Sequence, residues 1–176
     1  ARTAAAHGAR VLTGAAVTAV DGGEVHAVVD GALLVLRARS VVNATGVWAQ
    51  RLAPSVRLVP SRGSHLVLRA AAFGSPEAAL TVPLPGSRSR YVFALPHAGG
   101  LVHLGLTDEP VPGPVPDDDP RPSDAEVDQL LATVNQVLTR PLTRPDVVGS
   151  YAGLRPLVLP ESAGAGPGDA TADLSR

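Results

Sequence analysis

Short runs of β-type residues, separated by turn signals, dominate the first part of the chain. The runs span residues 17–20, 24–29, 33–39 and 41–44. Asp21-Gly22-Gly23 and Asp30-Gly31 stand between them, and Asp-Gly pairs suit tight hairpins. Ahead of these runs, the Ala-rich residues 2–10 resemble the last turns of a helix that closes at Gly8, before a strand that begins at Val11. The pattern predicts antiparallel strands that follow the end of a helix.

A second group of apolar runs predicts a further antiparallel sheet. These runs span residues 56–59, 65–68, 90–95 and 101–104. Residues 109–122 then carry repeated prolines, whose missing N–H groups and fixed φ angles exclude a helix and discourage the interior of a sheet. We therefore expect a loop there, and a surface loop at residues 161–176, where glycine and proline recur.

One helix is predicted after the Pro-rich loop. Ser123-Asp124-Ala125-Glu126 has the pattern of a capping box, in which the serine and the glutamate satisfy backbone N–H groups at the helix start. Apolar residues then recur at helical spacing up to Arg140-Pro141, namely Val127, Leu130, Leu131, Val134, Val137 and Leu138. Together these patterns predict an α+β fold, in which an antiparallel sheet carries helices on one face.

The composition excludes several classes of function. With 15 basic and 16 acidic residues the formal net charge is −1, so no overall field favours nucleic acid. The absence of cysteine removes disulfides, thiolate metal ligands and a cysteine nucleophile, and no metal site is predicted. No apolar stretch approaches the roughly 20 residues of a membrane-spanning helix. At 176 residues the chain has the length of one domain, whereas a cofactor domain plus a substrate domain needs roughly twice that length.

Two segments place chemically useful residues beside glycine. Asn43-Ala44-Thr45-Gly46 ends a β-rich run where backbone can approach a ligand closely, although a plain strand-ending turn is the simpler interpretation. Ser61-Arg62-Gly63-Ser64-His65 places an imidazole at the start of a predicted strand. Histidine ionises near neutrality, so it can accept an alcohol proton while hydride leaves the carbon. A lone histidine is nevertheless more often structural.

A third segment, Tyr151-Ala152-Gly153-Leu154-Arg155-Pro156-Leu157, sets one arginine among apolar residues. An unpaired charge in such a setting is costly, so Arg155 needs an anionic partner. The sequence leaves open whether this partner is an internal carboxylate or a ligand phosphate. A guanidinium can bind a phosphate bidentately.

These segments, in this order, resemble motifs of the FAD-dependent glycerol-3-phosphate dehydrogenases, which are DAO-type flavoproteins. Ala44-Thr45-Gly46 with Trp48 resembles the family's Ala-Thr-Gly-Pro-Trp motif, with Val47 in place of the proline. Arg62-Gly63-Ser64-His65 resembles its Lys-Gly-Ser-His motif, with Arg62 in place of the lysine. Residues 152–157 match its Ala-Gly-Leu-Arg-Pro-Leu motif at all six positions. Gly105-Leu106-Thr107-Asp108 resembles its Gly-Thr-Thr-Asp motif, with Leu106 in place of the first threonine.

The resemblance implies oxidation of sn-glycerol 3-phosphate to dihydroxyacetone phosphate, with electrons passing through FAD to a quinone. It makes His65 the candidate base and Arg155 the residue that binds the substrate phosphate. Further substrate-binding candidates are Arg62, Ser64, Thr107 and Asp108. The cofactor-binding candidates are Ala44, Thr45, Gly46, Trp48 and Val17.

The same resemblance implies the domain organisation. Residues 1–50 would belong to an incomplete FAD-binding domain with a few strands, residues 51–160 would form the substrate-binding domain, and residues 161–176 would lead back to the FAD-binding domain. The chain has no Gly-x-Gly-x-x-Gly fingerprint and no lysine, although the family uses both. We therefore expect an internal fragment that neither retains FAD tightly nor oxidises the substrate alone.

Two alternatives remain open at this point. A sarcosine or glycine oxidase would share the Ala-Thr-Gly element and a β-rich substrate domain, but it would not explain Arg155. A non-catalytic interaction domain could use prolines 110, 112, 114 and 116 as a polyproline-II ligand. For the dehydrogenase, the expected location is cytoplasmic, with possible peripheral contact on the inner face of the cell membrane through regions outside this chain. The sequence leaves open whether the enzyme is an oligomer.

Overall fold

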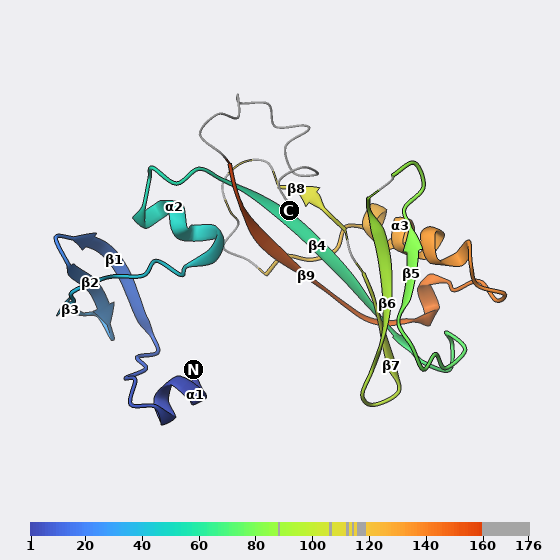
Figure 1. The fold of residues 1–176 in the computed structure, drawn as a ribbon, viewed down its shortest axis with the longest axis horizontal. Helices are drawn as coiled ribbons and strands as arrows, with labels where there is room; N and C mark the ends of the chain where they lie inside the picture. The colour runs from blue at the N-terminus through green and yellow to red at the C-terminus, as the bar shows by residue number, and fades with distance from the viewer. Residues whose placement is uncertain (88, 106, 112, 114, 116–118, 160–176) are drawn as a thin grey trace. The chain divides into compact units, whose positions relative to one another are not determined.

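The computed structural model describes residues 1–87, 89–105, 107–111, 113, 115 and 119–159 of the 176-residue chain. Contacts within the chain divide it into two units, residues 1–55 and residues 56–176. Figure 1 shows the elements of both units, and each unit is described by itself.

The first unit is built around an antiparallel sheet in the order β1-β2-β3. Its strands are β1 (Ala15–Asp21), β2 (Glu24–Val29) and β3 (Ala32–Arg37). Gly22 and Gly23 join β1 to β2, Asp30 and Gly31 join β2 to β3, and all four have positive φ. Positive φ at both loop residues characterises the tight type I′ hairpin, so the two hairpins predicted at the Asp-Gly pairs are confirmed.

The first strand begins later than predicted. The helices of this unit are α1 (Arg2–Ala6), the short 3₁₀ helix η1 (Gly46–Trp48) and α2 (Ala49–Leu52). β1 begins at Ala15 rather than Val11, because its partner β2 ends at Val29, which pairs with Ala15. Gly14 has a φ of +69°, which also interrupts an extended backbone just before the strand.

The strand predicted at residues 41–44 is absent. The Asn43 side chain donates to the Ala49 carbonyl at 2.9 Å, and its Oδ1 accepts from the Thr45 backbone N–H and hydroxyl. Such local side-chain bonds offer the backbone an alternative to a ladder. The prediction failed because apolar character was counted while the turn-forming asparagine was not.

The second unit contains a larger antiparallel sheet. Its strands are β4 (Leu58–Arg69), β5 (Leu80–Pro83), β6 (Tyr91–His97), β7 (Leu101–Gly105), β8 (Glu109–Pro110) and β9 (Val147–Val158). The order is β5-β6-β7-β4-β8, with β9 also paired to β4. Because β7 and β9 both pair with β4 at His65, they lie on opposite edges of β4. Figure 1 shows β4 and β9 side by side over their length.

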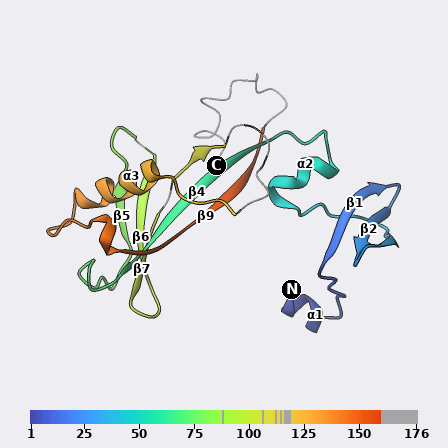
Figure 2. The same cartoon turned by 180° about the vertical axis from the view of Figure 1, so that it is seen from behind.

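One face of this sheet is covered by α3 (Asp124–Asn135), which contacts β4, β5 and β6 (Figure 2). The core between them is apolar and buried, and its members include Leu66, Leu68, Val82, Val92, Ala94, Val102, Leu104, Leu130, Leu131 and Val134. Each fully buried Leu or Val side chain among them contributes roughly 1.5–3 kcal/mol to folding. The predicted α+β class, with an antiparallel sheet and a helix on one face, is confirmed.

β4 differs from its prediction because it is one continuous strand. The predicted runs 56–59 and 65–68 are joined through Ser61-Arg62-Gly63-Ser64, which pairs without a break to residues 152–155 of β9. β9 itself was not predicted, because Gly149, Gly153 and Pro156 interrupt its apolar pattern. Pairing along the length of β4 overrides these weak strand formers.

α3 begins as predicted and ends early. Ser123 and Glu126 form the capping box, but the helix stops at Asn135 instead of continuing to residue 140. The Asn135 side chain bonds to both the backbone N–H and the carbonyl of Leu142, which fixes the turn that follows. Leu138 still packs against the core from this turn, so the apolar residues continue at helical spacing beyond the end of the helix.

The Pro-rich segment begins as strand rather than loop. Glu109 and Pro110 form β8, which pairs with Arg62 and Ser61 of β4. The described residues of 111–122 have no helix or strand. The predicted terminal loop at residues 161–176 lies outside the described residues. The short 3₁₀ helix η2 (Arg144–Asp146) leads into β9.

Candidate functional site

β4 directs alternate side chains to the two faces of its sheet. The face toward α3, called the helix face, carries Arg62, Ser64, Leu66 and Leu68. The opposite face, called the outer face, carries Ser61, Gly63, His65 and Val67. The five-residue motif at 61–65 is therefore divided between two faces.

The outer face brings the two central candidates together. Residues paired directly across an antiparallel ladder point to the same face. Opposite Ser61, Gly63 and His65 of β4, strand β9 places Arg155, Gly153 and Tyr151, respectively. The row between Arg155 and His65 thus consists of two glycines and contributes no side chain. Neighbouring rows on one face are about 7 Å apart, and the glycine row leaves room for the Arg155 guanidinium, which lies over Gly63 on the side of His65.

His65 is held by its neighbours on both edges of β4. Its ring stacks on Tyr151 with centroids 4.8 Å apart and an interplanar angle of 2°. On the other edge it lies over Gly105, where an added Cβ would come within 2.2 Å of the ring Cδ2. Its Nδ1 is buried and has no hydrogen-bond partner among the described residues. Glycine at position 105 is therefore required for this ring position.

The surroundings of His65 keep its imidazole neutral. Burial lowers the pKa of His65 below the usual 6.5, and the positive charge of Arg155 and the nearby His103 lower it further. Neutral imidazole predominates at pH 7 and can accept a proton. His103 also approaches the Tyr151 hydroxyl through Nδ1 at 3.1 Å, and its ring stacks with that of His97.

Arg155 reaches from its own row over Gly63. An added Cβ on Gly63 would lie 2.0 Å from Arg155 Nη2, so the guanidinium occupies the space that any other residue would fill. Nη1 donates to the Thr107 carbonyl at 3.1 Å and lies 3.9 Å from Asp108 Oδ1. Asp108 also accepts from the Ser61 hydroxyl. The Arg155 side chain keeps an exposed fraction of 33%.

Asp108 thus lies beside Arg155, whereas the side chains of the other three substrate-binding candidates, Arg62, Ser64 and Thr107, face the interior. Arg62 and Ser64 bond to Glu126 of α3 on the helix face, away from His65. Thr107 is 3% exposed, and its hydroxyl also donates to Glu126. Direct contact of Arg62 and Ser64 with a substrate stays a prediction from the motif alone.

The cofactor candidates all lie in the first unit. Ala44, Thr45 and Gly46 form the exposed turn that precedes Trp48, while Val17 lies in β1. Gly46 has a φ of +61°, and an added Cβ there would meet no atom within 4 Å. The turn is therefore open to close approach by a flat ligand, which fits a dinucleotide contact but does not by itself form a phosphate cradle.

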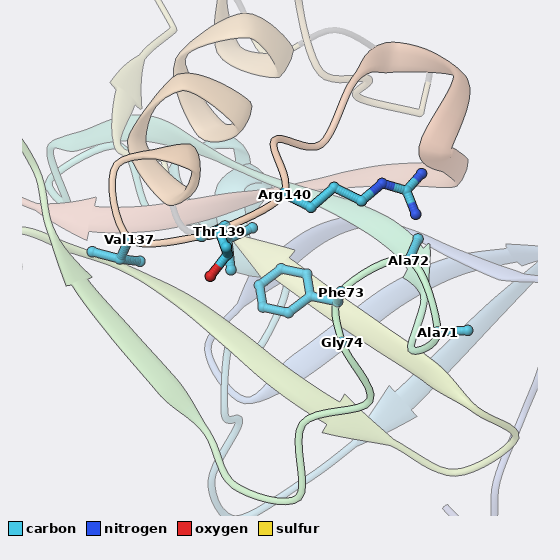
Figure 3. A pocket seen from close by; sticks show the side chains of 8 residues that line it. Ala71, Ala72, Phe73, Gly74, Val137, Thr139 and Arg140 are labelled. Atoms are coloured by element: carbon cyan, nitrogen blue, oxygen red, sulfur yellow. The ribbon is translucent and has the colours of Figure 1, made fainter.

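A hollow of about 280 Å³ lies elsewhere in the second unit, between residues 71–74 and 137–140. Figure 3 shows the Phe73 ring in this hollow and the Arg140 guanidinium directed away from it. None of the predicted site residues lines it. We therefore place the candidate site on the outer face of β4 and β9.

Comparison with known proteins shows the family of the chain. The family model described as DAO, FAD dependent oxidoreductase, matches residues 1–169. The chain belongs to this family. It is 51% identical over 179 residues to "Glycerol-3-phosphate dehydrogenase 1" of Mycobacterium tuberculosis, covering 100% of this chain and 34% of that protein. It is 35% identical over 191 residues to "Glycerol-3-phosphate dehydrogenase" of Mycobacterium leprae, covering 100% of this chain and 30% of the relative.

Solved structures of similar fold include two flavoenzymes. A glycerol-3-phosphate dehydrogenase from Bacillus halodurans, complexed with FAD, matches with a TM-score of 0.72 and 31% identity, over 89% of this chain and 33% of that one. A glycine oxidase from Bacillus cereus matches with a TM-score of 0.64 and 18% identity, over 89% and 41%, which shows the shared fold alone. The chain of this DAO-family member spans about a third of the length of its curated relatives.

Two further findings concern the described residues alone. No helix among them is long and apolar enough to cross a membrane. Nor do they contain a group of three or more His, Asp or Glu side chains placed to hold a metal ion.

Several residues of the site were not identified from sequence. The sequence pattern assigns Glu126 only to the helix cap and assigns Tyr151 no role. The alternation of β4 would have placed Arg62 and Ser64 opposite His65 if the strand had been predicted as continuous. Nothing in the sequence pattern indicates that Glu126 and Thr107 meet, since they are 19 residues apart and joined only by folding.

Proposed function

We propose that this chain supplies the substrate-binding face, and part of the cofactor contacts, of a flavoprotein that oxidises sn-glycerol 3-phosphate to dihydroxyacetone phosphate. The observation that carries the proposal is the outer face, where the Arg155 guanidinium extends over Gly63, in the row next to His65. Relatives named glycerol-3-phosphate dehydrogenase support the same substrate.

In this proposal Arg155 binds the substrate phosphate. A guanidinium matches two phosphate oxygens, and such charge-assisted pairs are among the strongest hydrogen bonds in proteins. The internal carboxylate of Asp108 lies 3.9 Å from Nη1, at the outer limit of an ion pair, and it also accepts from Ser61. A phosphate of higher charge can therefore compete for Arg155.

His65 accepts the proton of the substrate's secondary hydroxyl. Its lowered pKa keeps the imidazole ready to accept, and the nearby cation of Arg155 opposes premature protonation. FAD, when bound, would supply the acceptor for the hydride that leaves the carbon carrying this hydroxyl. The stacked Tyr151 ring and Gly105 hold the imidazole, while the Arg155 guanidinium over Gly63 is directed to the phosphate end of the substrate.

The cofactor contacts are assigned to the first unit. Ala44, Thr45, Gly46 and Trp48 of the exposed turn, with Val17, are proposed to contact FAD. We expect the 176-residue chain alone to bind FAD weakly and to lack activity, because it has no Gly-x-Gly-x-x-Gly segment to seat a pyrophosphate. A purified chain whose flavin absorbance corresponds to its own molar concentration would contradict this.

The electron acceptor belongs to the same proposal. We assign it to a quinone, reached by peripheral contact with the inner face of the cell membrane. Cosedimentation of the full-length enzyme with anionic vesicles tests the contact, and reduction of a soluble quinone analogue tests the acceptor. An enzyme that reduces oxygen as fast as the quinone would contradict the assignment.

Turnover by the full-length enzyme that carries this chain tests the proposed reaction. Glycerol 3-phosphate and N-methylglycine are compared at equal concentration with a dye as electron acceptor. The proposal predicts dye reduction with glycerol 3-phosphate and none above background with N-methylglycine. Preference for the amine would replace the dehydrogenase by an amine oxidase.

A further inference from the structure

The buried carboxylate of Glu126 joins three elements. Oε2 accepts from the backbone N–H and hydroxyl of Ser123 at the start of α3, each at 2.8 Å, and from Nε and Nη2 of Arg62 on β4. Oε1 accepts from the hydroxyls of Ser64 and Thr107, each at 2.8 Å. Glu126 is 3% exposed, so no substrate reaches it directly.

Thr107 connects this carboxylate to the outer face. Its hydroxyl donates to Glu126 and accepts from the Ser64 backbone N–H, while its carbonyl accepts from Arg155 Nη1 at 3.1 Å. The next residue, Asp108, holds its carboxylate 3.9 Å from the same nitrogen. The interior side of this segment is thus bound by Glu126, and its other side faces the guanidinium.

The backbone at Thr107 needs such an anchor. Gly105 of β7 pairs with His65, and Glu109 of β8 pairs with Arg62. From Gly105 to Glu109 the chain advances four residues, whereas from His65 to Arg62 the paired strand β4 advances only three. One residue between Gly105 and Glu109 is therefore in excess, and regular ladder pairing cannot hold the backbone there. Side-chain bonds hold the segment instead: the Thr107 hydroxyl donates to Glu126, and Asp108 accepts from the Ser61 hydroxyl at its carboxylate and from Arg90 Nη2 at its carbonyl.

We propose that Glu126 is a positioning residue for the anion-binding site: by holding Thr107 it sets the Thr107 carbonyl and the Asp108 carboxylate that orient Arg155. This inference rests on the proposed function of Arg155. It also implies that Arg62 and Ser64 act on the site indirectly, because both hydrogen-bond to the Glu126 carboxylate on the helix face. It also explains why a capping glutamate extends past its own helix.

A purely stabilising role for Glu126 makes a different prediction, and Thr107 separates the two. Thr107→Val removes the hydroxyl that joins Glu126 to this segment and leaves the helix cap and the Arg62 ion pair in place. Thr107→Ser keeps the hydroxyl and is the rescue variant. Asn135→Ala is the matched control, because it removes two side-chain hydrogen bonds at the other end of α3.

In the full-length enzyme, we expect Thr107→Val and Glu126→Gln each to raise KM for glycerol 3-phosphate about three- to tenfold, because the Thr107 carbonyl is then held less firmly against Arg155. The kcat should change less than about twofold. The affinity for propyl phosphate, which lacks the oxidisable hydroxyl, should fall by the same factor in calorimetry. Thr107→Ser should behave as wild type, and Asn135→Ala should lower the melting temperature without raising KM.

The double variant Thr107→Val/Glu126→Gln completes the test. Because both changes interrupt one connection, its KM should exceed the larger single effect by less than about twofold. If the rise in KM of the double variant equalled the product of the two single rises, Thr107 and Glu126 would act separately, and the proposal would be overturned. An unchanged KM in Thr107→Val, or an equal rise in Asn135→Ala, would also overturn it. If wild type does not oxidise glycerol 3-phosphate, the proposed function fails instead.

Discussion

At the scale of single residues, the candidate site depends on where side chains are missing. Gly63 and Gly153 pair across β4 and β9, between Arg155 and His65, and contribute no side chain of their own. Gly63 and Gly105 also give room to the guanidinium and to the imidazole, respectively. The two polar groups are thus placed by glycines as much as by hydrogen bonds.

Gly63→Ala should displace Arg155 while leaving the fold intact. The new Cβ would lie 2.0 Å from Nη2, and the flexible guanidinium can move away at little cost in stability. We expect KM for glycerol 3-phosphate in the full-length enzyme to rise about tenfold, as a charge-assisted contact is weakened. Gly149→Ala is the control, since its Cβ would meet Val67 at an ordinary 3.8 Å. Equal kinetics for both variants would show that Gly63 does not position Arg155.

His65 should titrate below pH 6.5 in the 176-residue chain. Burial lowers its pKa first, and the charge of Arg155 adds to this, so Arg155→Gln should raise the pKa without restoring it fully. NMR titration of the ring protons, assigned with His65→Gln, measures both values. Arg144→Gln, which removes an exposed arginine bound to Asp124 and Asp128, is the control. A His65 midpoint at or above 6.5 would refute the account of its environment.

At the scale of elements, sequence patterns succeeded where the cause was local. The Asp-Gly hairpins and the capping box of α3 depend on residues within a few positions, and both formed as predicted. β9 and the continuity of β4 depend on pairing across about 90 residues of sequence, which single-strand patterns do not contain. Arg155 was found because its motif is contiguous, whereas Glu126 was missed because helix capping already accounts for it.

α3 should make the chain sensitive to acid through Glu126. Burial raises the pKa of this carboxyl, but the hydrogen bonds from Arg62, Ser123 and Ser64 outweigh it and lower the pKa from 4.5 to about 2. Because the folded pKa is the lower one, the stabilisation is present above pH 4.5 and is lost as pH falls toward 2. It amounts to about 3 kcal/mol.

Urea unfolding of the chain, followed by circular dichroism between pH 7 and pH 2, measures this loss. Glu126→Gln should be less stable at pH 7 and should lose less stability between pH 4.5 and pH 2. Asp128→Asn, which changes an exposed carboxylate of the same helix, should keep the acid sensitivity of wild type. Parallel curves for wild type and Glu126→Gln would show that other groups cause the acid sensitivity.

At the scale of the whole molecule, the two units divide the proposed work. The first unit carries the exposed turn at Gly46, and the second carries the outer face with His65 and Arg155. The DAO family match extends over residues 1–169 and so includes both units. The relatives are about three times as long as this chain, which is why activity is tested in the full-length enzyme.

The central claim is that Arg155 recognises the substrate phosphate. Its most direct test is the ratio of kcat/KM for glycerol 3-phosphate to that for glycerol, in wild-type full-length enzyme and in Arg155→Ala. Loss of one charge-assisted contact costs about 1.5–3 kcal/mol, so the ratio should fall at least about tenfold in the variant. The control Arg144→Ala should leave it unchanged. A ratio that stays the same in Arg155→Ala would contradict the account.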